Sequence, residues 1–290
     1  MPNHAPTIEC WIIHFEVPAE ASMIVSEWFN DGILVDEGEG EFLLYVESAP
    51  QHDEWQQRFI ELAEVAQIAN RIPFEILPVQ AEDWVAKTQI KNFCLEIGRF
   101  VIYDPFYQGE VPQAHIPICV DAQFSFGAGD HPTTKGCLLA LDEITHRDFT
   151  PLSMLDIGCG TGILSIAMGK LWHGPILASD IKSTAVDATR ENTSLNGLTN
   201  RISCIEADGL RHPSFKEYAP YQLVCANVLA PVLVDIAASL DTLIAPSCTI
   251  ILSGILLHQA DQVVAAYALL GFIEHKRFPI GDWVTLSLSR

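Results

Sequence analysis

The segment that most constrains the fold is a glycine-rich loop between a short apolar run and a helical one. Met154–Ile157 reads as a buried strand, Gly158-Cys159-Gly160-Thr161-Gly162 follows it, and Ile163–Leu171 reads as a helix. Glycines at such a junction allow a sharp turn and let the backbone approach a ligand without a Cβ in the way. The new helix presents free N–H groups there. The segment therefore predicts a ligand site where the strand ends.

Strand-like and helical segments alternate after residue 150. Further apolar strands are predicted over Ile176–Ser179, Ile202–Ile205 and Tyr221–Ala226, each separated from the next by enough chain for a helix. This alternation predicts a parallel sheet with helices on both faces, a Rossmann-like α/β domain.

Acidic residues at the strand ends suggest what the glycine loop binds. The loop spacing is Gly-x-Gly-x-Gly, and not the Gly-x-Gly-x-x-Gly typical of dinucleotide sites. Asp180 ends the second strand, where a carboxylate can accept hydrogen bonds from a ribose diol. Asp208 follows the third strand and could accept from an adenine amine, with a helix cap or a solvated loop acid as alternatives. The pattern favours an adenosine-bearing cofactor without separating S-adenosylmethionine from NAD.

Two further residues near the loop have candidate roles. Cys159 could be a nucleophile, but it has no paired base in the sequence, and packing is the favoured interpretation. Asp156, inside the first strand, is expected to hold the backbone of the glycine loop or to approach the charged end of the cofactor.

The first eighty residues predict a separate, smaller domain. Apolar spacing indicates strands over Trp11–Val17, Ile33–Val35, Phe42–Val46 and Phe74–Val79, and helices over Ala21–Phe29 and Trp55–Ala69. This βαββαβ order is that of a ferredoxin-like sandwich, with Pro78 placing the last strand at an edge. The fold carries no function by itself, so a partner-docking module and a purely structural appendage are the alternatives.

The predicted boundaries put the smaller domain at residues 1–78 and the α/β domain at 79–290. The α/β domain begins with a turn-rich lead-in over 79–118. Short strands are expected in and just beyond the lead-in, over Glu96–Asp104 and His115–Asp121.

Net charge narrows the possible partners. The chain has 37 acidic and 16 basic residues, a formal charge of −21. Residues 1–75 contain 15 Asp and Glu against only Arg58 and Arg71, a net charge of −13. Such a field repels phosphate backbones and anionic lipid surfaces, which excludes non-specific binding to nucleic acid or membrane. It would attract a basic partner.

Composition indicates the cellular setting. Hydrophobic residues make up 49% of the chain, which excludes a disordered protein, yet no run approaches the roughly 18 apolar residues of a membrane span. The start of the chain has no basic region before an apolar run, so we expect no secretory signal. The eight cysteines form no Cys-x-x-Cys pair, so we expect no zinc site and a reducing cytoplasm.

Several short motifs together resemble one known family. They are Phe124–Thr134, Leu155–Gly162, Asn227–Ala230, Leu252–Leu256 and Gly281–Val284. In this order and spacing they resemble the ribosomal protein L11 methyltransferase family, from about Asp83 to the C-terminus. The βαββαβ start also resembles the substrate-recognition domain of that family.

The resemblance implies an activity and a set of residues. It implies methyl transfer from S-adenosylmethionine to lysine and N-terminal amino groups of ribosomal protein L11, by a monomer. Thr134 would match the second threonine of the family's His-Pro-Thr-Thr segment and Gly158 the first glycine of its loop, which also contains Gly160. Asp180 would match its ribose-binding acid and Asn227 the asparagine of its Asn-Ile-Leu-Ala segment.

The sequence also departs from the family pattern. Ala128 and Asp130 replace two threonines, and Asp121-Ala122-Gln123 stands where Asp-Pro-Gly is typical. These departures bear on the loop expected to cover the methionine end of the cofactor, and so on the identity of the acceptor.

The chemistry assigns roles to Asn227 and His131. The Asn227 amide oxygen could orient an amine but cannot act as a base; its alternative is a helix N-cap for Pro231–Ile244. His131 is the nearest candidate proton acceptor by motif position, with loop ordering as its alternative. No metal is expected, because the cofactor supplies the leaving group.

Three rival functions remain open. One is a methyltransferase acting on a glutamine amide or an adenine amine, and another is an NAD-dependent oxidoreductase. The third is a protein that binds S-adenosylmethionine but methylates nothing.

Overall fold

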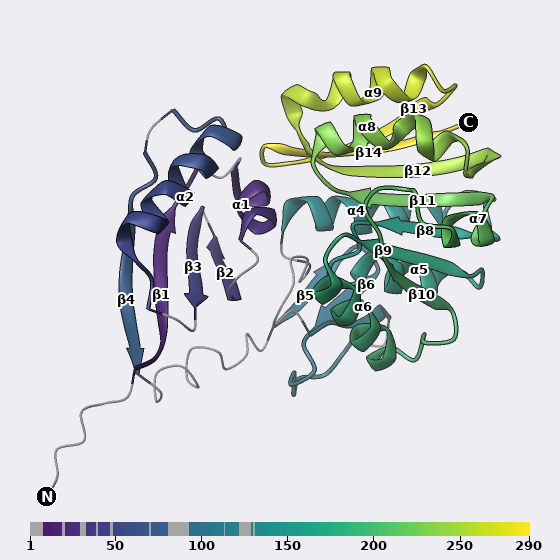
Figure 1. Ribbon diagram of the computed structural model, residues 1–290. Coiled ribbons are helices and arrows are strands. Elements are labelled where there is room, and N and C mark those ends of the chain that lie inside the picture. The colour runs from purple at the N-terminus through teal and green to yellow at the C-terminus, as the bar shows by residue number, and fades with distance from the viewer. Residues whose placement is uncertain are drawn as a thin grey trace, which may run out of the picture. The chain divides into compact units, whose positions relative to one another are not determined.

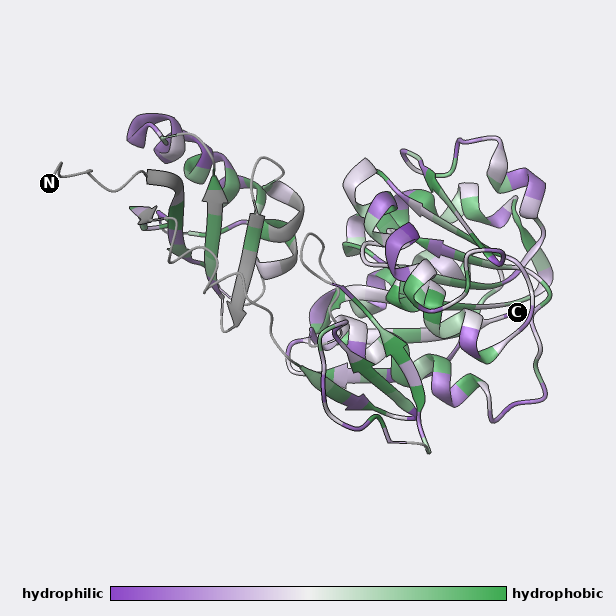
Figure 2. Ribbon diagram, turned by 90° about the horizontal axis from the view of Figure 1, so that it is seen from below, coloured by the Kyte–Doolittle hydropathy of each residue, from purple (hydrophilic) through white to green (hydrophobic). Residues whose placement is uncertain are grey.

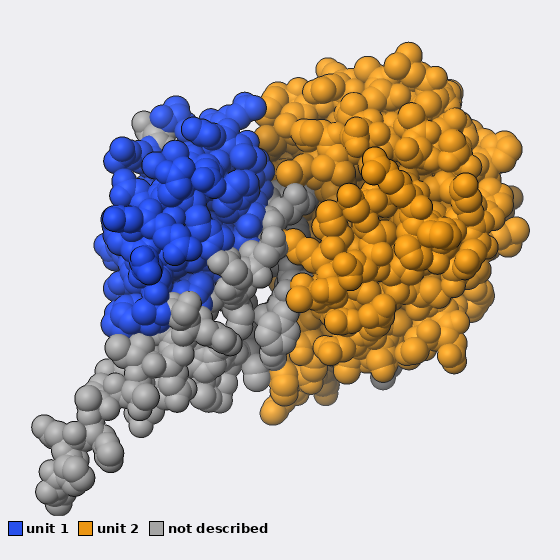
Figure 3. All heavy atoms as spheres, viewed as in Figure 1, with its two compact units in different colours: residues 1–91 blue, residues 92–290 orange. Residues whose placement is uncertain are grey.

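The computed structural model describes residues 8–18, 21–29, 33–38, 40–46, 49–69, 71–80, 93–112, 114–121, 129 and 131–290. The chain divides into two compact units, Met1–Lys91 and Asn92–Arg290 (Figure 3). No helix in the described part of the chain is long and apolar enough to cross a membrane.

Unit 1 is a four-stranded antiparallel sheet with two helices. Its elements are β1 (Ile8–Glu16), α1 (Ser22–Trp28), β2 (Ile33–Gly38), β3 (Glu41–Val46), α2 (His52–Val65) and β4 (Phe74–Gln80). The strand order is β2-β3-β1-β4, so β4 lies at an edge, as Pro78 predicted. Aromatic rings fill the core: Phe15 lies 4.8 Å from Phe59 and 5.5 Å from Phe42 between ring centroids.

The predicted βαββαβ element order is therefore observed, although several element boundaries differ from the predicted ones. The second helix ends at Val65 and does not reach Ala69. Gln67 has a φ of +55°, which no helix accommodates, so the apolar spacing continues past the point where the backbone has already turned.

Unit 2 is a mixed α/β unit built on a large central sheet. Its first elements are β5 (Cys94–Ile97), β6 (Phe100–Tyr103), β7 (Ile116–Cys119), α4 (Pro132–Ile144), β8 (Met154–Ile157) and α5 (Ile163–Leu171). Next come β9 (Ile176–Asp180), α6 (Ser183–Leu195), β10 (Ile202–Glu206), α7 (Ser214–Tyr218), β11 (Tyr221–Asn227) and α8 (Ala230–Asp241). The last elements are β12 (Ile244–Leu256), η2 (Leu257–Gln259), α9 (Ala260–Ala268), β13 (Ile273–Ile280) and β14 (Trp283–Ser289).

The seven-stranded sheet has the order β10-β9-β8-β11-β12-β14-β13 (Figure 1). Strands β8 to β12 run parallel to one another, whereas β14 is antiparallel to β12 and to β13. The order reverses at β8: the chain moves outward through β9 and β10, then returns to β11 on the other side of β8. Ligands in such sheets bind at the carboxyl ends of the strands, beside the point where the strand order reverses. In this chain the glycine loop lies at that position.

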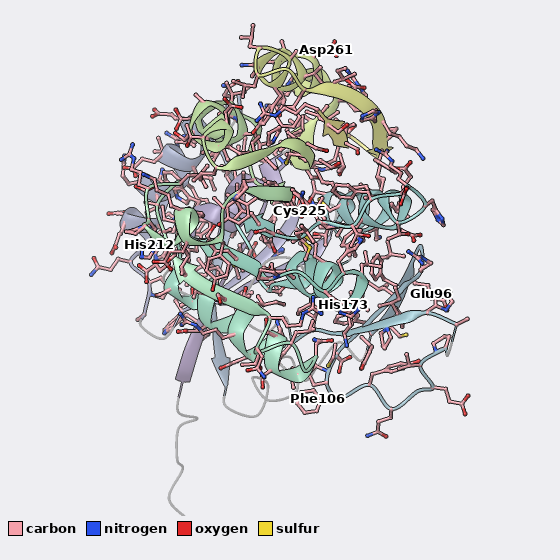
Figure 4. The ribbon with its side chains drawn as sticks, turned by 90° about the vertical axis from the view of Figure 1, so that its right-hand side faces the viewer. Glu96, Phe106, His173, His212, Cys225 and Asp261 are labelled. Carbon is pink, nitrogen blue, oxygen red and sulfur yellow. The ribbon has the colours of Figure 1, made fainter. Side chains whose placement is uncertain are left out.

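Helices cover both faces of this sheet because successive strand residues point to opposite sides. Met154 packs in one hydrophobic core with residues of α4 and α5, whereas its neighbour Leu155 packs in the other with residues of α8 and α9. Much of the strand ribbon in Figure 2 is green, the hydrophobic colour, and Cys225, labelled in Figure 4, lies within β11, the middle strand of the sheet.

The segment before α4 differs from the prediction. Glu96–Asp104 was expected to be one strand, but it contains parts of two antiparallel strands, β5 and β6, which join β7 in a small three-stranded sheet. Gly98, with a φ of +56°, makes the turn between them. An added Cβ there would lie 2.7 Å from the Asp142 carboxylate, so the turn also packs against α4.

Candidate functional site

The glycine loop joins β8 to α5 in a tight turn. Gly158, Gly160 and Gly162 all have positive φ, at +71°, +54° and +80°. The backbone N–H groups of Gly158 and Cys159 both donate to the Ser179 carbonyl, at 2.8 and 3.0 Å. The loop is therefore held against the end of the neighbouring strand β9.

Gly158 also allows a close approach from β11. A Cβ at this position would lie 2.4 Å from Cγ1 of Val228, the residue that follows β11. Because real Cβ contacts are never this short, only glycine fits unless Val228 moves. The glycine loop and the segment after β11 are thus packed directly against each other.

Asp180 has a structural role that its sequence position did not reveal. Its Oδ2 accepts from the Gly160 N–H at 3.0 Å, and its Oδ1 accepts from the Lys182 N–H at 3.0 Å. The carboxylate lies at the carboxyl end of β9, as the ribose assignment requires, and it anchors the glycine loop as well. A carboxylate oxygen can accept more than one hydrogen bond, so this anchoring is compatible with a bound diol.

Asp208 lies at the same edge of the sheet as Asp180. Glu206 of β10 pairs with Asp180, and the Ala207 N–H donates to the Asp180 carbonyl at 2.9 Å. Asp208 itself is exposed. The helix-cap alternative for it is wrong, because the N-cap of the next helix, α7, is Pro213.

Asp156 is fully buried beneath the loop. Its Oδ2 accepts from the backbone N–H and the hydroxyl of Ser165, at 2.9 and 2.6 Å. Burial raises the pKa of the carboxyl to about 6; the Ser165 bonds oppose this rise and the charge of Asp180 adds to it. Through these two bonds Asp156 holds the first turn of α5. The sequence had suggested that it holds the backbone of the glycine loop.

Cys159 has the environment of a packing residue. Its side chain is buried, and its Sγ lies 3.2 Å from the Thr189 hydroxyl oxygen. Burial, with the nearby Asp156 and Asp180 charges, raises the pKa of the thiol well above its ordinary value. A thiol that resists ionisation is a poor nucleophile, which agrees with the packing interpretation.

Asn227 is the last residue of β11. The capping alternative for it is wrong, because α8 begins at Ala230 with Leu229 as its N-cap, and the helix ends at Asp241. Parallel pairing places Asn227 beside Ser253 of β12, and its neighbour Ala226 beside Ile157 of β8. The Asn227 amide is therefore next to the start of the glycine loop.

His131 caps the helix that contains Thr134. Its Nδ1 accepts from the Thr133 N–H at 3.3 Å and lies 2.7 Å from the Thr133 hydroxyl, while its ring meets the Trp283 ring edge-on at 5.3 Å. The Ser253 hydroxyl donates to the Thr133 carbonyl at 3.1 Å. Four of the motif segments singled out in the sequence, those containing Thr134, Asn227, Ser253 and Trp283, are thus brought together by the fold.

Three buried side-chain oxygens at this edge have no hydrogen-bond partner among the described residues. They are Thr134 Oγ1, Asp156 Oδ1 and Asn227 Oδ1. Unpartnered buried oxygens cost free energy unless a ligand satisfies them. Asp156 lies two residues before Gly158, and Asn227 precedes Val228, which packs against Gly158; all three oxygens can accept from N–H or O–H groups. This arrangement fits a polar, cationic adenosine cofactor.

A separate cavity of about 400 Å³ lies at the amino-terminal ends of the strands, opposite the glycine loop. Its lining includes Arg99, Arg147 and His173, the last labelled in Figure 4. It sits where α4 and α5 end and β8 and β9 begin, and its two arginines are paired with Asp142 and Glu143. It has no contact with the glycine loop and no excess of positive charge to bind an anion.

Comparison with known sequences assigns the chain to a family. The family model for ribosomal protein L11 methyltransferase (PrmA) matches residues 24–290. The chain belongs to the ribosomal protein L11 methyltransferase family. Curated relatives of that name are 36% identical over 229 residues in Rhodopseudomonas palustris, covering 79% of this chain and 77% of the relative, and 34% identical over 254 residues in Bradyrhizobium diazoefficiens, covering 88% and 85%.

A solved member of the family has the same architecture. The crystal structure of ribosomal protein L11 methylase from Lactobacillus delbrueckii subsp. bulgaricus superposes with a TM-score of 0.61 at 28% identity, covering 68% of this chain and 98% of that one. The departures from the family pattern at Ala122, Gln123, Ala128 and Asp130 lie outside the described residues. The predicted site residues Thr134, Gly158, Gly160, Asp180, Asp208 and Asn227 all lie within the described residues.

Proposed function

We propose that the chain transfers methyl groups from S-adenosylmethionine to lysine and N-terminal amino groups of ribosomal protein L11. The observation that carries the proposal is that Thr134, Asp156 and Asn227 each have a buried side-chain oxygen without a hydrogen-bond partner in the described chain, in a member of this family. When bound, S-adenosylmethionine supplies the methyl group and the sulfonium leaving group. The residues that would hold it are Thr134, Gly158, Gly160, Asp180, Asp208 and Asn227.

Asn227 is assigned to orienting the acceptor amine. Its Oδ1 is buried and has no partner in the described chain, so it can accept a hydrogen bond from an incoming N–H. Fixing the direction of a nucleophile in this way lowers the entropic part of the barrier. An amide oxygen does not take up the proton, so the amine must be neutral when it attacks.

Lowering the pKa of the acceptor amine is assigned to apolar surroundings beside Asn227, to which the half-buried Val228 contributes. Apolar surroundings disfavour an ammonium ion and so lower the pKa of a lysine side chain that enters them. His131 is assigned to ordering α4, because its Nδ1 lies within hydrogen-bond distance of both the N–H and the hydroxyl of Thr133.

Unit 1 is assigned to docking the substrate as a ferredoxin-like module. Its observed strand order, β2-β3-β1-β4 with a βαββαβ chain order, supports that fold. Its acid excess, net −13 over residues 1–75, complements a ribosomal protein, which is basic because it binds RNA. The reaction would then take place in the cytoplasm.

The decisive experiment is incubation with labelled S-adenosylmethionine and large-subunit ribosomal proteins that lack methylation, followed by mass analysis. The expected result is label on lysine and N-terminal amines of one basic protein, L11. Label on a glutamine amide or on an adenine would replace the proposed acceptor. Cofactor binding without transfer to any component would show a catalytically silent binding protein.

Two variants test the residue assignments. We expect Asp180→Ala to weaken cofactor binding, measured by calorimetry, with the circular dichroism of the fold unchanged. We expect Asn227→Ala to lower turnover more than cofactor affinity, because Asn227 is assigned a contact with the acceptor in addition to one with the cofactor. Unchanged affinity in the first variant, or full turnover in the second, would contradict the respective assignment.

A further inference from the structure

A row of polar side chains on α6 holds the carbonyl groups of the glycine loop. Thr189 and Asn192 are fully buried and lie one turn apart on the helix. The Thr189 hydroxyl donates to the Gly160 carbonyl at 2.9 Å, and the Asn192 amide Nδ2 donates to the Thr161 carbonyl at 2.9 Å. Two successive carbonyls of the loop are therefore fixed by one helix.

The same helix also holds the end of β7. Asn192 exchanges two hydrogen bonds with the backbone of Asp121, accepting from its N–H at 2.8 Å and donating to its carbonyl at 3.0 Å. Asn196, one turn later, does the same with Cys119, at 3.1 and 2.7 Å. These asparagines meet alternate residues of the chain and pair with them as a neighbouring strand would.

Asn192 is the member of this pair that reaches both segments. Its Nδ2 has two hydrogens, and one goes to Asp121 and the other to Thr161. Asn196 binds Cys119 and the carbonyl of Asn192, and has no recorded bond to the glycine loop. The two residues thus make the same kind of contact with the strand end but differ in their contact with the loop.

We propose that Asn192 is a positioning residue for the cofactor: it sets the glycine loop in register with the end of β7 by bridging Thr161 and Asp121. The inference rests on the proposed function in one respect, that this loop binds S-adenosylmethionine. Removing the Asn192 amide deprives the buried Thr161 carbonyl and the part-buried Asp121 carbonyl of these donors. The glycine loop is then no longer held at a fixed position relative to the end of β7. The loop conformation that binds the cofactor becomes one of several conformations that the loop adopts.

The test compares Asn192→Ala with the matched control Asn196→Ala. Calorimetry with S-adenosylhomocysteine measures the Kd of each, and hydrogen exchange of the ligand-free proteins measures the opening of residues 158–162. For Asn192→Ala we expect a Kd raised about tenfold and faster exchange in the loop, whereas for Asn196→Ala we expect less than about a twofold change in Kd and faster exchange only around residues 116–121.

Each outcome decides one question. Loop exchange in Asn192→Ala that matches the unaltered chain overturns the inference, and so does an equal rise in Kd in both variants, which would indicate general loosening of β7. Failure of the unaltered chain to bind S-adenosylhomocysteine would refute the proposed function, while the exchange data would still test the bridge. If Asn192→Ala does not fold, Asn192→Asp keeps the side-chain volume and the acceptor for the Asp121 N–H but lacks the donors, and the same results are expected.

Discussion

Replacing Asp156 by asparagine should make the chain's stability less dependent on pH. The carboxyl is fully buried at the end of β8, and burial raises its pKa from 3.8 to about 6. The folded state therefore binds this proton more tightly than the unfolded state does. The stabilising effect of the protonated carboxyl is fully present below the unfolded pKa and is lost as the pH rises through about 6.

The magnitude follows from the two pKa values. Their difference of about 2 corresponds to about 3 kcal/mol of unfolding free energy lost between low pH and pH 7.5. Asparagine has nearly the same shape, and its Oδ1 can accept both Ser165 bonds, but it does not ionise. Asp156→Asn should therefore gain about 2 kcal/mol relative to the unaltered chain between pH 4.5 and pH 7.5.

Urea unfolding followed by circular dichroism at these two pH values measures this gain. Asp208→Asn is a suitable control, because it removes an exposed carboxylate at the same edge of the sheet and reports the effect of one negative charge. A stability difference between Asp156→Asn and the unaltered chain that is the same at both pH values would refute the argument. That result would mean that burial does not raise the pKa of the Asp156 carboxyl in the folded chain.

Two further predictions concern the cofactor and the substrate. Gly158→Ala should raise the Kd for S-adenosylhomocysteine measured by calorimetry, because its Cβ would lie 2.4 Å from Val228 Cγ1. Adding Val228→Ala should restore part of the affinity. Gly197→Ala is the control: Gly197 has a similar φ of +69° and no atom within 4 Å of an added Cβ, so this variant should leave the Kd unchanged. If unit 1 docks a basic substrate by its charge, the KM for ribosomal protein L11 should rise with ionic strength more than the KM for the cofactor, since salt screens exposed charges beyond about 10 Å at 0.1 M. A KM for L11 that is independent of salt would leave the acid excess without a role in docking.

Local patterns in the sequence predicted several elements of unit 2. Met154–Ile157, Ile163–Leu171 and Ile176–Asp180 are a strand, a helix and a strand as expected, because each is a short apolar run bounded by glycines or polar residues. The glycine loop and the acid that follows the next strand were placed at the right edge of the sheet for the same reason. Parallel strands bring their carboxyl ends together whatever the details of packing.

Errors arose where the backbone conformation of a single residue overrides the pattern. Gly98 and Gln67 both have positive φ, and each ends an element that the apolar spacing would continue. The helix predicted over Pro231–Ile244 ends at Asp241, because Ile244 already belongs to β12. Periodicity shows which face of a segment is apolar, but it does not show where the chain turns.

The sequence by itself determined the α/β class, the family and the end of the sheet where the proposed cofactor residues lie, because each of these follows from short contiguous motifs. The tertiary structure alone decided how those motifs are held together. Asn192 bonds to a residue 71 positions away and to another 31 positions away, and Ser253 bonds across 120 positions to Thr133. Hydrogen bonds from side chains to distant backbone groups produce no periodic pattern in the sequence. A polar residue on a buried helix face does not indicate its partner, because only the fold shows which carbonyl group it contacts.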